Sequence, residues 1–238
     1  MIPWETIDQA RIPGQESKIT LRKRGTEFSI RTIETELMNS RVHGSEEALA
    51  ELACRCLDHK SGLKILIGGL GMGYTLAAAL AHSAPDSLIT VSELIPAVIR
   101  WNREHLGHLA GMPLDNPRVS IKQEDVADTI KTQRSAWDAI LLDVDNGPDG
   151  LTQKANNRLY NTIGLQKAFS ALSPGGILAI WSSKPDPAFT ARLKRCRFKT
   201  QAIDVRAREN KKGSTHTIWL AQRPSSVQVK QSSIDQKI

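Results

Sequence analysis

Acidic side chains follow three successive apolar runs in the middle of the chain, where each run ends. Glu93 closes the run 89–92, Asp125 follows the run 119–121, and Asp143 and Asp145 follow the run 137–142. Carboxylates accept hydrogen bonds from hydroxyl and amino groups, and they take protons from amines. If the runs are neighbouring parallel strands, their acids meet at the carboxyl edge of one sheet, where ligands of open α/β folds bind.

Two of these acids suit a nucleoside. Glu93 lies about twenty residues beyond a glycine-rich loop, the place from which a carboxylate accepts both ribose hydroxyls. Asp125 is expected to accept from the adenine amino group, with Val126 or Leu94 packed on the ring. A solvated strand end is the alternative interpretation of Glu93.

The glycine-rich loop is Gly69-Leu70-Gly71-Met72-Gly73, between an apolar run and a helix-like segment that begins at Tyr74. Glycines permit a sharp turn and a close approach of a ligand to the backbone, and the helix start offers free N–H groups. The dinucleotide fingerprint G-x-G-x-x-G requires glycine where Tyr74 stands. The G-x-G-x-G pattern therefore favours a nucleoside with an amino-acid-like tail, with a plain tight turn as the alternative.

Short apolar runs alternate with helix-like segments from residue 63 onward. This pattern predicts a doubly wound α/β fold with a mostly parallel seven-stranded sheet. The last two strands have a short connection and are expected to form an antiparallel edge hairpin. The predicted strands are 64–67, 88–91, 119–121, 139–142, 177–181, 198–207 and 215–221, and the predicted helices are 45–58, 73–82, 96–107, 157–172 and 187–195.

The N-terminal residues have a different pattern, in which short extended runs within 18–40 indicate a β-hairpin or small antiparallel sheet. We therefore divide the chain into a small N-terminal β-region (1–44), a nucleoside-binding domain (45–222) and a flexible polar tail (223–238).

The formal net charge of +7 is confined to one segment. Residues 192–212 hold nine Lys or Arg and two acids, and the rest of the chain is neutral. A uniformly basic nucleic-acid-binding surface is therefore not predicted. We interpret the segment as a solvated helix face and hairpin turn; contact with an anionic partner such as nucleic acid is the alternative.

The termini and cysteines predict a cytoplasmic protein without metal. No secretory signal or apolar stretch of membrane-spanning length is present. Three cysteines suit no paired disulfide framework, and the spacings of zinc sites are absent. Trp101 is expected to pack on the sheet, and His216 is expected to be structural.

In sum, the sequence resembles the class I S-adenosylmethionine-dependent methyltransferase fold, and within it the spermidine synthase-like (polyamine aminopropyltransferase) branch. The resemblance covers roughly residues 25–185. It is carried by the glycine loop, Val91-Ser92-Glu93-Leu94, Asp115-Asn116-Pro117-Arg118-Val119, Asp125, the segment 137–148, Leu159-Tyr160 and Leu172-Ser173-Pro174-Gly175-Gly176-Ile177-Leu178.

The resemblance implies that decarboxylated S-adenosylmethionine donates an aminopropyl group to an amine, and that the protein is a homodimer. It implies that Glu93 holds ribose, that Asp125 binds adenine, and that Asp143 accepts the proton of the attacking amine. For Asp143 the alternative is binding of the donor's amino group without proton transfer. Here the family's D-x-x-D-P motif reads Asp143-Val144-Asp145-Asn146-Gly147-Pro148, so the second acid comes two positions later instead of three.

The acceptor pocket is less defined by the sequence. We expect Asp145 or Asn146 to assist Asp143, and His43, Glu46, Tyr160 and Trp181 to line the pocket. For Tyr160 and Trp181 the alternative is core packing, and for His43 a solvated loop. Two other functions stay open: methyl transfer from intact S-adenosylmethionine to a small acceptor or RNA, and a non-catalytic nucleoside-binding module.

Overall fold

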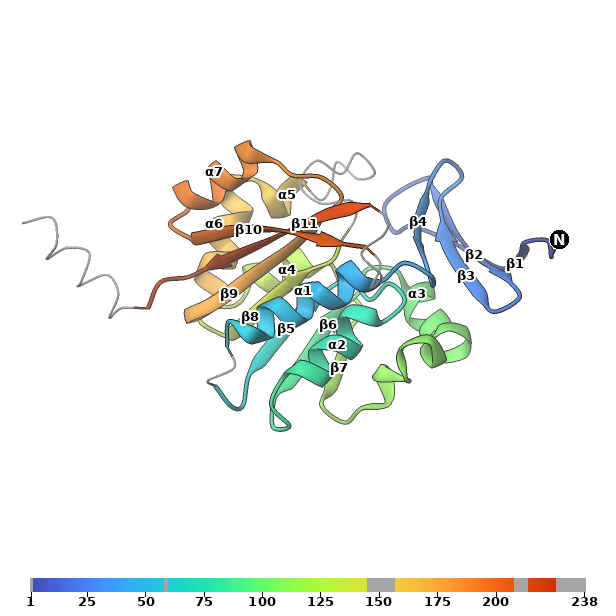
Figure 1. The fold of residues 1–238 in the computed structure, drawn as a ribbon, viewed down its shortest axis with the longest axis horizontal. Helices are drawn as coiled ribbons and strands as arrows, with labels where there is room; N and C mark the ends of the chain where they lie inside the picture. Colours follow the sequence, from blue (N-terminus) through green and yellow to red (C-terminus); the bar gives the residue numbers. More distant parts are fainter. Residues whose placement is uncertain (1, 58–59, 145–156, 208–213, 226–238) are drawn as a thin grey trace, which may run out of the picture.

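The N-terminal part of the chain forms a four-stranded antiparallel sheet (Figure 1). The computed structural model describes residues 2–57, 60–144, 157–207 and 214–225. The predicted hairpin is present, with a turn at Gly25. An additional strand, 5–11, pairs with it at the edge of the sheet, and none of its side chains is fully buried. The strands, in sheet order, are β1 (Glu5–Arg11), β2 (Lys18–Arg24), β3 (Glu27–Arg31) and β4 (Glu36–Asn39).

The second sheet has seven strands, as the sequence predicts. Five are parallel, and β11 pairs antiparallel with both β9 and β10, which confirms the edge hairpin. The strand order reverses between β5 and β8, so a crevice opens at their carboxyl ends. The order is β10 (Lys199–Arg206), β11 (Thr215–Gln222), β9 (Leu172–Ser182), β8 (Trp137–Leu142), β5 (Lys64–Gly68), β6 (Leu88–Ser92) and β7 (Val119–Lys122).

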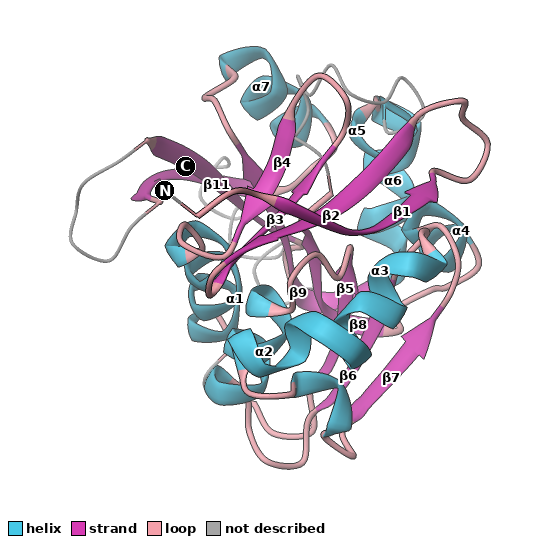
Figure 2. Ribbon diagram, turned by 90° about the vertical axis from the view of Figure 1, so that its right-hand side faces the viewer, coloured by secondary structure: helices cyan, strands magenta, loops and turns pink. Residues whose placement is uncertain are grey.

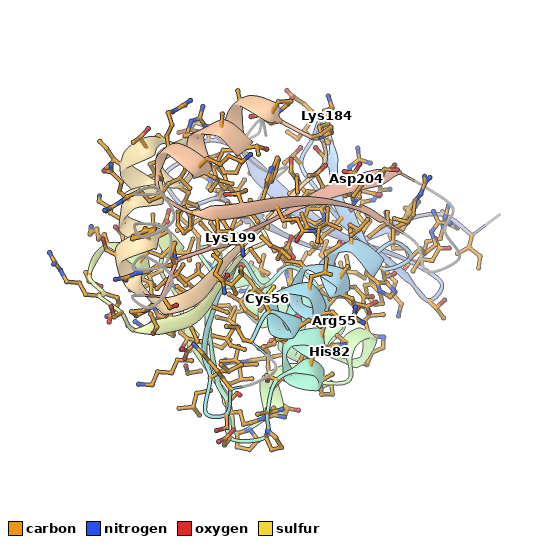
Figure 3. All side chains as sticks on the ribbon, turned by 60° about the vertical axis from the view of Figure 1, so that its left-hand side comes forward. Arg55, Cys56, His82, Lys184, Lys199 and Asp204 are labelled. Atoms are coloured by element: carbon orange, nitrogen blue, oxygen red, sulfur yellow. The ribbon has the colours of Figure 1, made fainter. Side chains whose placement is uncertain are left out.

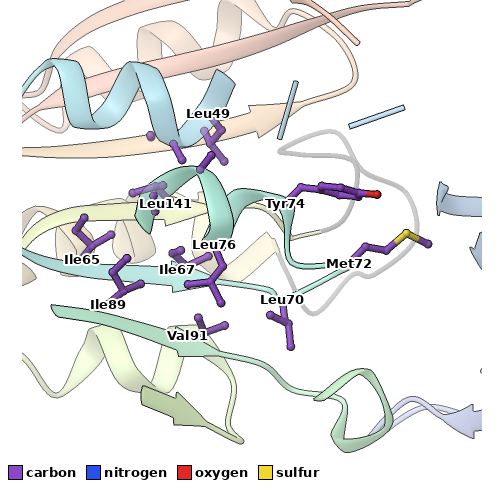
Figure 4. Close-up of a cluster of buried hydrophobic side chains, with 14 of the residues drawn as sticks. Leu49, Ile65, Ile67, Leu70, Met72, Tyr74, Leu76, Ile89, Val91 and Leu141 are labelled. Carbon is purple, nitrogen blue, oxygen red and sulfur yellow. The ribbon is translucent and has the colours of Figure 1, made fainter. Parts of the chain in front are cut away.

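Helices cover both faces of this sheet (Figures 1 and 2). Alternate strand residues point to opposite faces, so Ile65 and Ile67 join one hydrophobic cluster and Leu66 joins the other. Figure 4 shows the first cluster, where Leu76 and Leu49 meet the side chains of β5, β6 and β8. This face carries α1 (Gly44–Arg55), α2 (Tyr74–His82) and α3 (Pro96–Trp101), and the other carries α4 (Val126–Lys131), α5 (Asn157–Tyr160), α6 (Thr162–Ala171) and α7 (Pro187–Arg195).

Three predicted boundaries are wrong. The helix expected over 96–107 ends as α3 at Trp101 and continues as a π turn, Asn102–Leu106, and 3₁₀ turns, Gly107–Ala110 and Pro113–Asp115. The helix expected over 157–172 is divided at Asn161, whose side chain caps α6 by accepting from the Gly164 N–H at 2.8 Å. Strand β9 begins at Leu172, five residues before its predicted start.

The four-stranded sheet is fixed above the carboxyl edge of the larger one. Asp8 on β1 accepts hydrogen bonds from the Trp101 indole at 2.7 Å and from Arg100 at 2.5 Å, both on α3. Its apolar face also joins the cluster that contains α1 and α2. Trp101 is fully buried, as its predicted packing requires.

The described part of the basic segment lies on α7 and β10. Figure 3 shows Lys199 and Asp204 along β10 at the edge of the sheet, with Arg55 and Cys56 at the end of the neighbouring α1.

In the described residues, no helix combines the length and apolar character that crossing a bilayer demands.

Candidate active site

A cavity of about 460 Å³ lies at the carboxyl edge of the seven-stranded sheet, beneath the four-stranded sheet. Both sheets and the start of α1 contribute to it. Nine residues that the sequence predicts for the site are in its lining: Glu46, Gly69, Gly71, Glu93, Leu94, Asp125, Val126, Asp143 and Trp181.

Two positions of the glycine loop combine a positive φ with a contact that a Cβ would make too short. Gly69 has φ +87°, and a Cβ there would lie 2.5 Å from the carbonyl oxygen of Asp143. Gly71 has φ +53°, and a Cβ there would lie 2.6 Å from Cε of Met38 on β4. The loop backbone therefore packs directly against the end of β8 and against the N-terminal sheet. Gly73 is outside the cavity lining; it precedes α2 and packs near Asn102.

Glu93 connects the glycine loop to the end of β6. Its side chain is buried, and its two oxygens accept from the backbone N–H groups of Leu70 and Ile95, each at 2.8 Å. Burial raises the pKa of Glu93, while the backbone N–H donors favour its ionised form. Each oxygen retains lone-pair capacity for a further donor on the cavity side.

Asp125 follows β7 and is the N-cap residue of α4. Its Oδ1 accepts from the Ala127 N–H at 2.8 Å, and its Oδ2 accepts from Nη2 of Arg158 on α5. Val126, the next residue, is buried against Gly68, where a Cβ would lie 2.9 Å from Cγ2 of Val126. An amino group that binds Asp125 would share this carboxylate with Arg158.

Asp143 follows β8 and lies near Glu46 of α1. Oδ2 of Asp143 accepts from the Thr75 hydroxyl at 2.7 Å. Burial raises the pKa of Asp143, and the Thr75 bond opposes that shift. Burial, and then the negative charge of Asp143, raise the pKa of Glu46 to about 7. Glu46 can therefore hold a proton near neutral pH beside Asp143, as an acid–base site requires.

His216 also lines the cavity, although the sequence suggests a structural role. Its Nδ1 lies 2.9 Å from Oγ of Ser45, and its ring stacks edge-to-face on Trp181 with 4.7 Å between centroids. Ser45 Oγ in turn donates to Oε2 of Glu46 at 2.6 Å. Burial lowers the pKa of His216, which favours a neutral imidazole.

Two predicted acceptor residues lie outside the lining. Tyr160 is buried between α5 and α7, and its hydroxyl donates to the carbonyl of Val144 at 3.3 Å. His43 precedes α1, binds Glu47 at 3.0 Å and stacks on Tyr74. Asp145 and Asn146 lie outside the described residues.

The cavity has a strongly acidic lining. Five carboxylates contribute to it, and no Lys or Arg among the described residues does so. Such a lining favours cationic ligands and disfavours carboxylates. The acids are Glu36, Glu46, Glu93, Asp125 and Asp143. Nowhere in the described ranges do three His, Cys, Asp or Glu side chains gather in a way that could hold a metal ion.

Strands β4 and β11 contribute lining residues that the sequence does not predict. Leu37, Met38 and Asn39 of β4 line the cavity, as does His216 of β11. No local motif marks these residues, because they reach the site only when the two sheets meet and β11 pairs beside β9. Thr75 had a local signal, since it lies in the first turn after the glycine loop.

The strand order, the glycine loop at β5 and the acids at the ends of β6 and β8 define a class I methyltransferase-like α/β protein. Within that class, the chain belongs to the spermine/spermidine synthase family. The spermine/spermidine synthase domain of that family matches residues 43–191.

Curated relatives match part of the chain. Polyamine aminopropyltransferase 2 of Pseudomonas aeruginosa is 30% identical over 128 residues, which cover 52% of this chain and 34% of that protein. Polyamine aminopropyltransferase of Mycobacterium tuberculosis is 30% identical over 130 residues, covering 53% and 24%. The match to the Aeropyrum pernix enzyme has 25% identity and covers 74% and 58%. The matched segments thus span about a third or less of the first two relatives.

Solved structures share the fold over nearly the whole chain. Spermidine synthase from Thermotoga maritima superposes with a TM-score of 0.73 at 17% identity, covering 92% of this chain and 72% of that one. A spermidine synthase in complex with the transition state analogue AdoDATO gives a TM-score of 0.71 at 18% identity, with the same coverage.

Proposed function

We propose that this protein transfers an aminopropyl group from decarboxylated S-adenosylmethionine to an amine. The acidic lining of the cavity, without a Lys or Arg from the described residues, carries this proposal. A sulfonium donor with an amino tail and an ammonium acceptor are both cationic, and each gains from nearby carboxylates. Family membership and the names of the relatives support the same activity.

The donor would bind across the glycine loop. Glu93 would accept from the ribose hydroxyls, and Asp125 would accept from the adenine amino group. Val126 and Leu94 would pack on the adenine ring. The turn at Gly69 and Gly71 would let the donor approach the backbone closely, since neither position carries a side chain.

The reaction is a direct displacement at carbon. The lone pair of the acceptor nitrogen forms the new C–N bond, while the electron pair of the C–S bond goes to sulfur and leaves a neutral thioether. Asp143 would take the proton of the amine, since burial raises the pKa of its carboxyl and brings it closer to neutral pH. The cavity would align the reactants and exclude water.

The choice between aminopropyl and methyl transfer depends on the donor. Intact S-adenosylmethionine adds a carboxylate to the tail, which would meet the charge of Asp143 and Glu46 without a Lys or Arg from the described lining. We therefore expect tighter binding of the decarboxylated donor in calorimetric titrations with each compound. Preference for the carboxylated donor would contradict aminopropyl transfer, and binding of neither would support a different ligand.

The acceptor class is tested by turnover. We expect the purified chain, given decarboxylated S-adenosylmethionine and a panel of primary amines, to release one thioether nucleoside for each new secondary amine detected by mass spectrometry. A panel in which no amine gains an aminopropyl group, despite donor binding, would overturn the activity.

A further inference from the structure

The acceptor end of the cavity contains a chain of three polar side chains from distant parts of the sequence. Glu46 and Ser45 begin α1, and His216 lies on β11. Ser45 is fully buried, so its hydroxyl must be satisfied by neighbouring side chains. It bonds to both others, at 2.6 Å to Oε2 of Glu46 and 2.9 Å to Nδ1 of His216.

The donor directions in this chain follow from its chemistry. The single hydrogen of the Ser45 hydroxyl goes to Glu46 when that carboxylate is ionised, so Ser45 Oγ accepts from Nδ1–H of His216. This fixes Oε2 of Glu46. Glu46 lines the cavity, and its own backbone N–H also donates to its carboxylate, so both local hydrogen bonds favour the ionised form.

We propose that Ser45 and His216 hold Glu46 as a second proton-accepting carboxylate beside Asp143, and that this pair takes up the proton released by the acceptor amine. The inference rests on the proposed function and adds three residues to it. Glu46 is the catalytic group of the three, because its carboxylate lines the cavity near Asp143, whereas His216 is connected to it through Ser45. Ser45 and His216 are positioning residues that act through it.

The proton balance of the reaction requires a group that accepts one proton from the amine, and the pair supplies it. The acceptor enters as a primary ammonium ion and gives one proton to the pair, and its lone pair then forms the C–N bond as the C–S pair goes to sulfur. The products are a secondary ammonium ion and a neutral thioether. One proton per turnover therefore stays on the pair until solvent takes it.

Charged and titratable neighbours determine when Glu46 is available. Asp143 after β8 disfavours the ionised form, and Glu47 on the same helix does so more weakly. Tyr74 on α2 also interacts with Glu46, and His216 approaches from β11. Strand β9 supplies the uncharged Trp181, and Ala207, the residue after β10, supplies its backbone carbonyl to Gly44. The Ser45 bond favours the ionised form, so its loss raises the pKa of Glu46.

Variants of these residues test the inference through kcat/KM for the amine against pH. We expect Glu46→Gln to lower it about 100-fold and to remove the ionisation near pH 7. Ser45→Ala and His216→Ala are expected to move that ionisation upward by about one pH unit. His216→Asn offers an amide N–H close to the Nδ1 position and should return the ionisation to its wild-type pH. The matched control is Glu47→Gln, which keeps the activity and moves the ionisation slightly downward at most.

A second measurement separates this inference from the proposed activity. In ¹³C NMR of the full chain labelled at the glutamate carboxyls, the resonance lost in Glu46→Gln identifies Glu46. The midpoint pH of the Glu46 titration should rise in Ser45→Ala and His216→Ala and should return to the wild-type value in His216→Asn. An unchanged midpoint in Ser45→Ala, or a Glu46→Gln enzyme that keeps its pH profile, overturns the inference. If the wild type modifies no amine, the proposed function fails, and the titration still decides whether Ser45 and His216 hold Glu46.

Discussion

Replacing Glu46 by Gln should make the protein more stable at alkaline pH. Burial and the nearby Asp143 raise the pKa of Glu46 from its ordinary 4.5 to about 7. Between these values the folded chain binds more protons than the unfolded chain, so the free energy of unfolding falls as the pH rises. A difference of about 2.5 units, at about 1.36 kcal/mol per unit, corresponds to about 3 kcal/mol lost above pH 7. Gln has the same shape and no charge, and its carbonyl can accept the Ser45 hydrogen bond.

Urea denaturation of the wild type and of Glu46→Gln at pH 5 and pH 8 measures this effect. We expect the variant to gain stability relative to the wild type between the two pH values, by about 2 to 3 kcal/mol. Glu47→Gln is the matched control and should show no comparable gain, because the Glu47 side chain is partly exposed and contacts His43 at the start of α1. The reasoning is refuted if the free energies of unfolding of Glu46→Gln and the wild type differ by the same amount at pH 5 and pH 8.

Three further substitutions test other parts of the site. Asp143→Asn keeps an acceptor for Thr75 but removes the base, so turnover should fall about 100-fold or more while calorimetry finds donor affinity nearly unchanged; unchanged turnover would eliminate the base role. Gly69→Ala should lower the free energy of unfolding by about 2 kcal/mol more than Gly14→Ala, since both have positive φ but only Gly69 faces a backbone atom at 2.5 Å; equal losses in urea denaturation would contradict this steric argument. Glu93→Gln replaces one of two backbone-bound oxygens by an NH₂ group, so donor binding in calorimetry should weaken about tenfold or more, and wild-type affinity would count against the ribose contact.

The fold of the larger sheet was predictable because its signals are local. Runs such as 65–67 are apolar on both faces, and only a parallel sheet covered on both sides buries every residue of such a run. The glycine loop and the acids Glu93 and Asp125 could be located for the same reason, since the loop begins, and each acid lies, within three residues after the end of a strand. Strand β1 was missed because an edge strand with mostly exposed side chains carries little hydrophobic pattern.

The acceptor side of the site could not be located in this way. Tyr160 ends α5, the next described helix after the acidic end of β8, yet its ring packs in the second hydrophobic cluster and is not part of the cavity lining. His216 begins an ordinary apolar strand, and nothing in its neighbours indicates the bond to Ser45, 171 residues earlier. Such contacts depend on which strands pair, and pairing depends on the whole chain.

The sequence by itself determined the α/β class, the glycine loop and the positions of the acids after β6 and β7, because strand and helix periodicity and turn chemistry act over a few residues. The tertiary structure decided what surrounds Asp143. Packing of α1 against β8 and β11 brings Glu46 and His216 to the cavity, and the N-terminal sheet closes it through Met38. Burial and charge proximity, which shift the ionisation of Glu46 and Asp143, exist only after these elements have met.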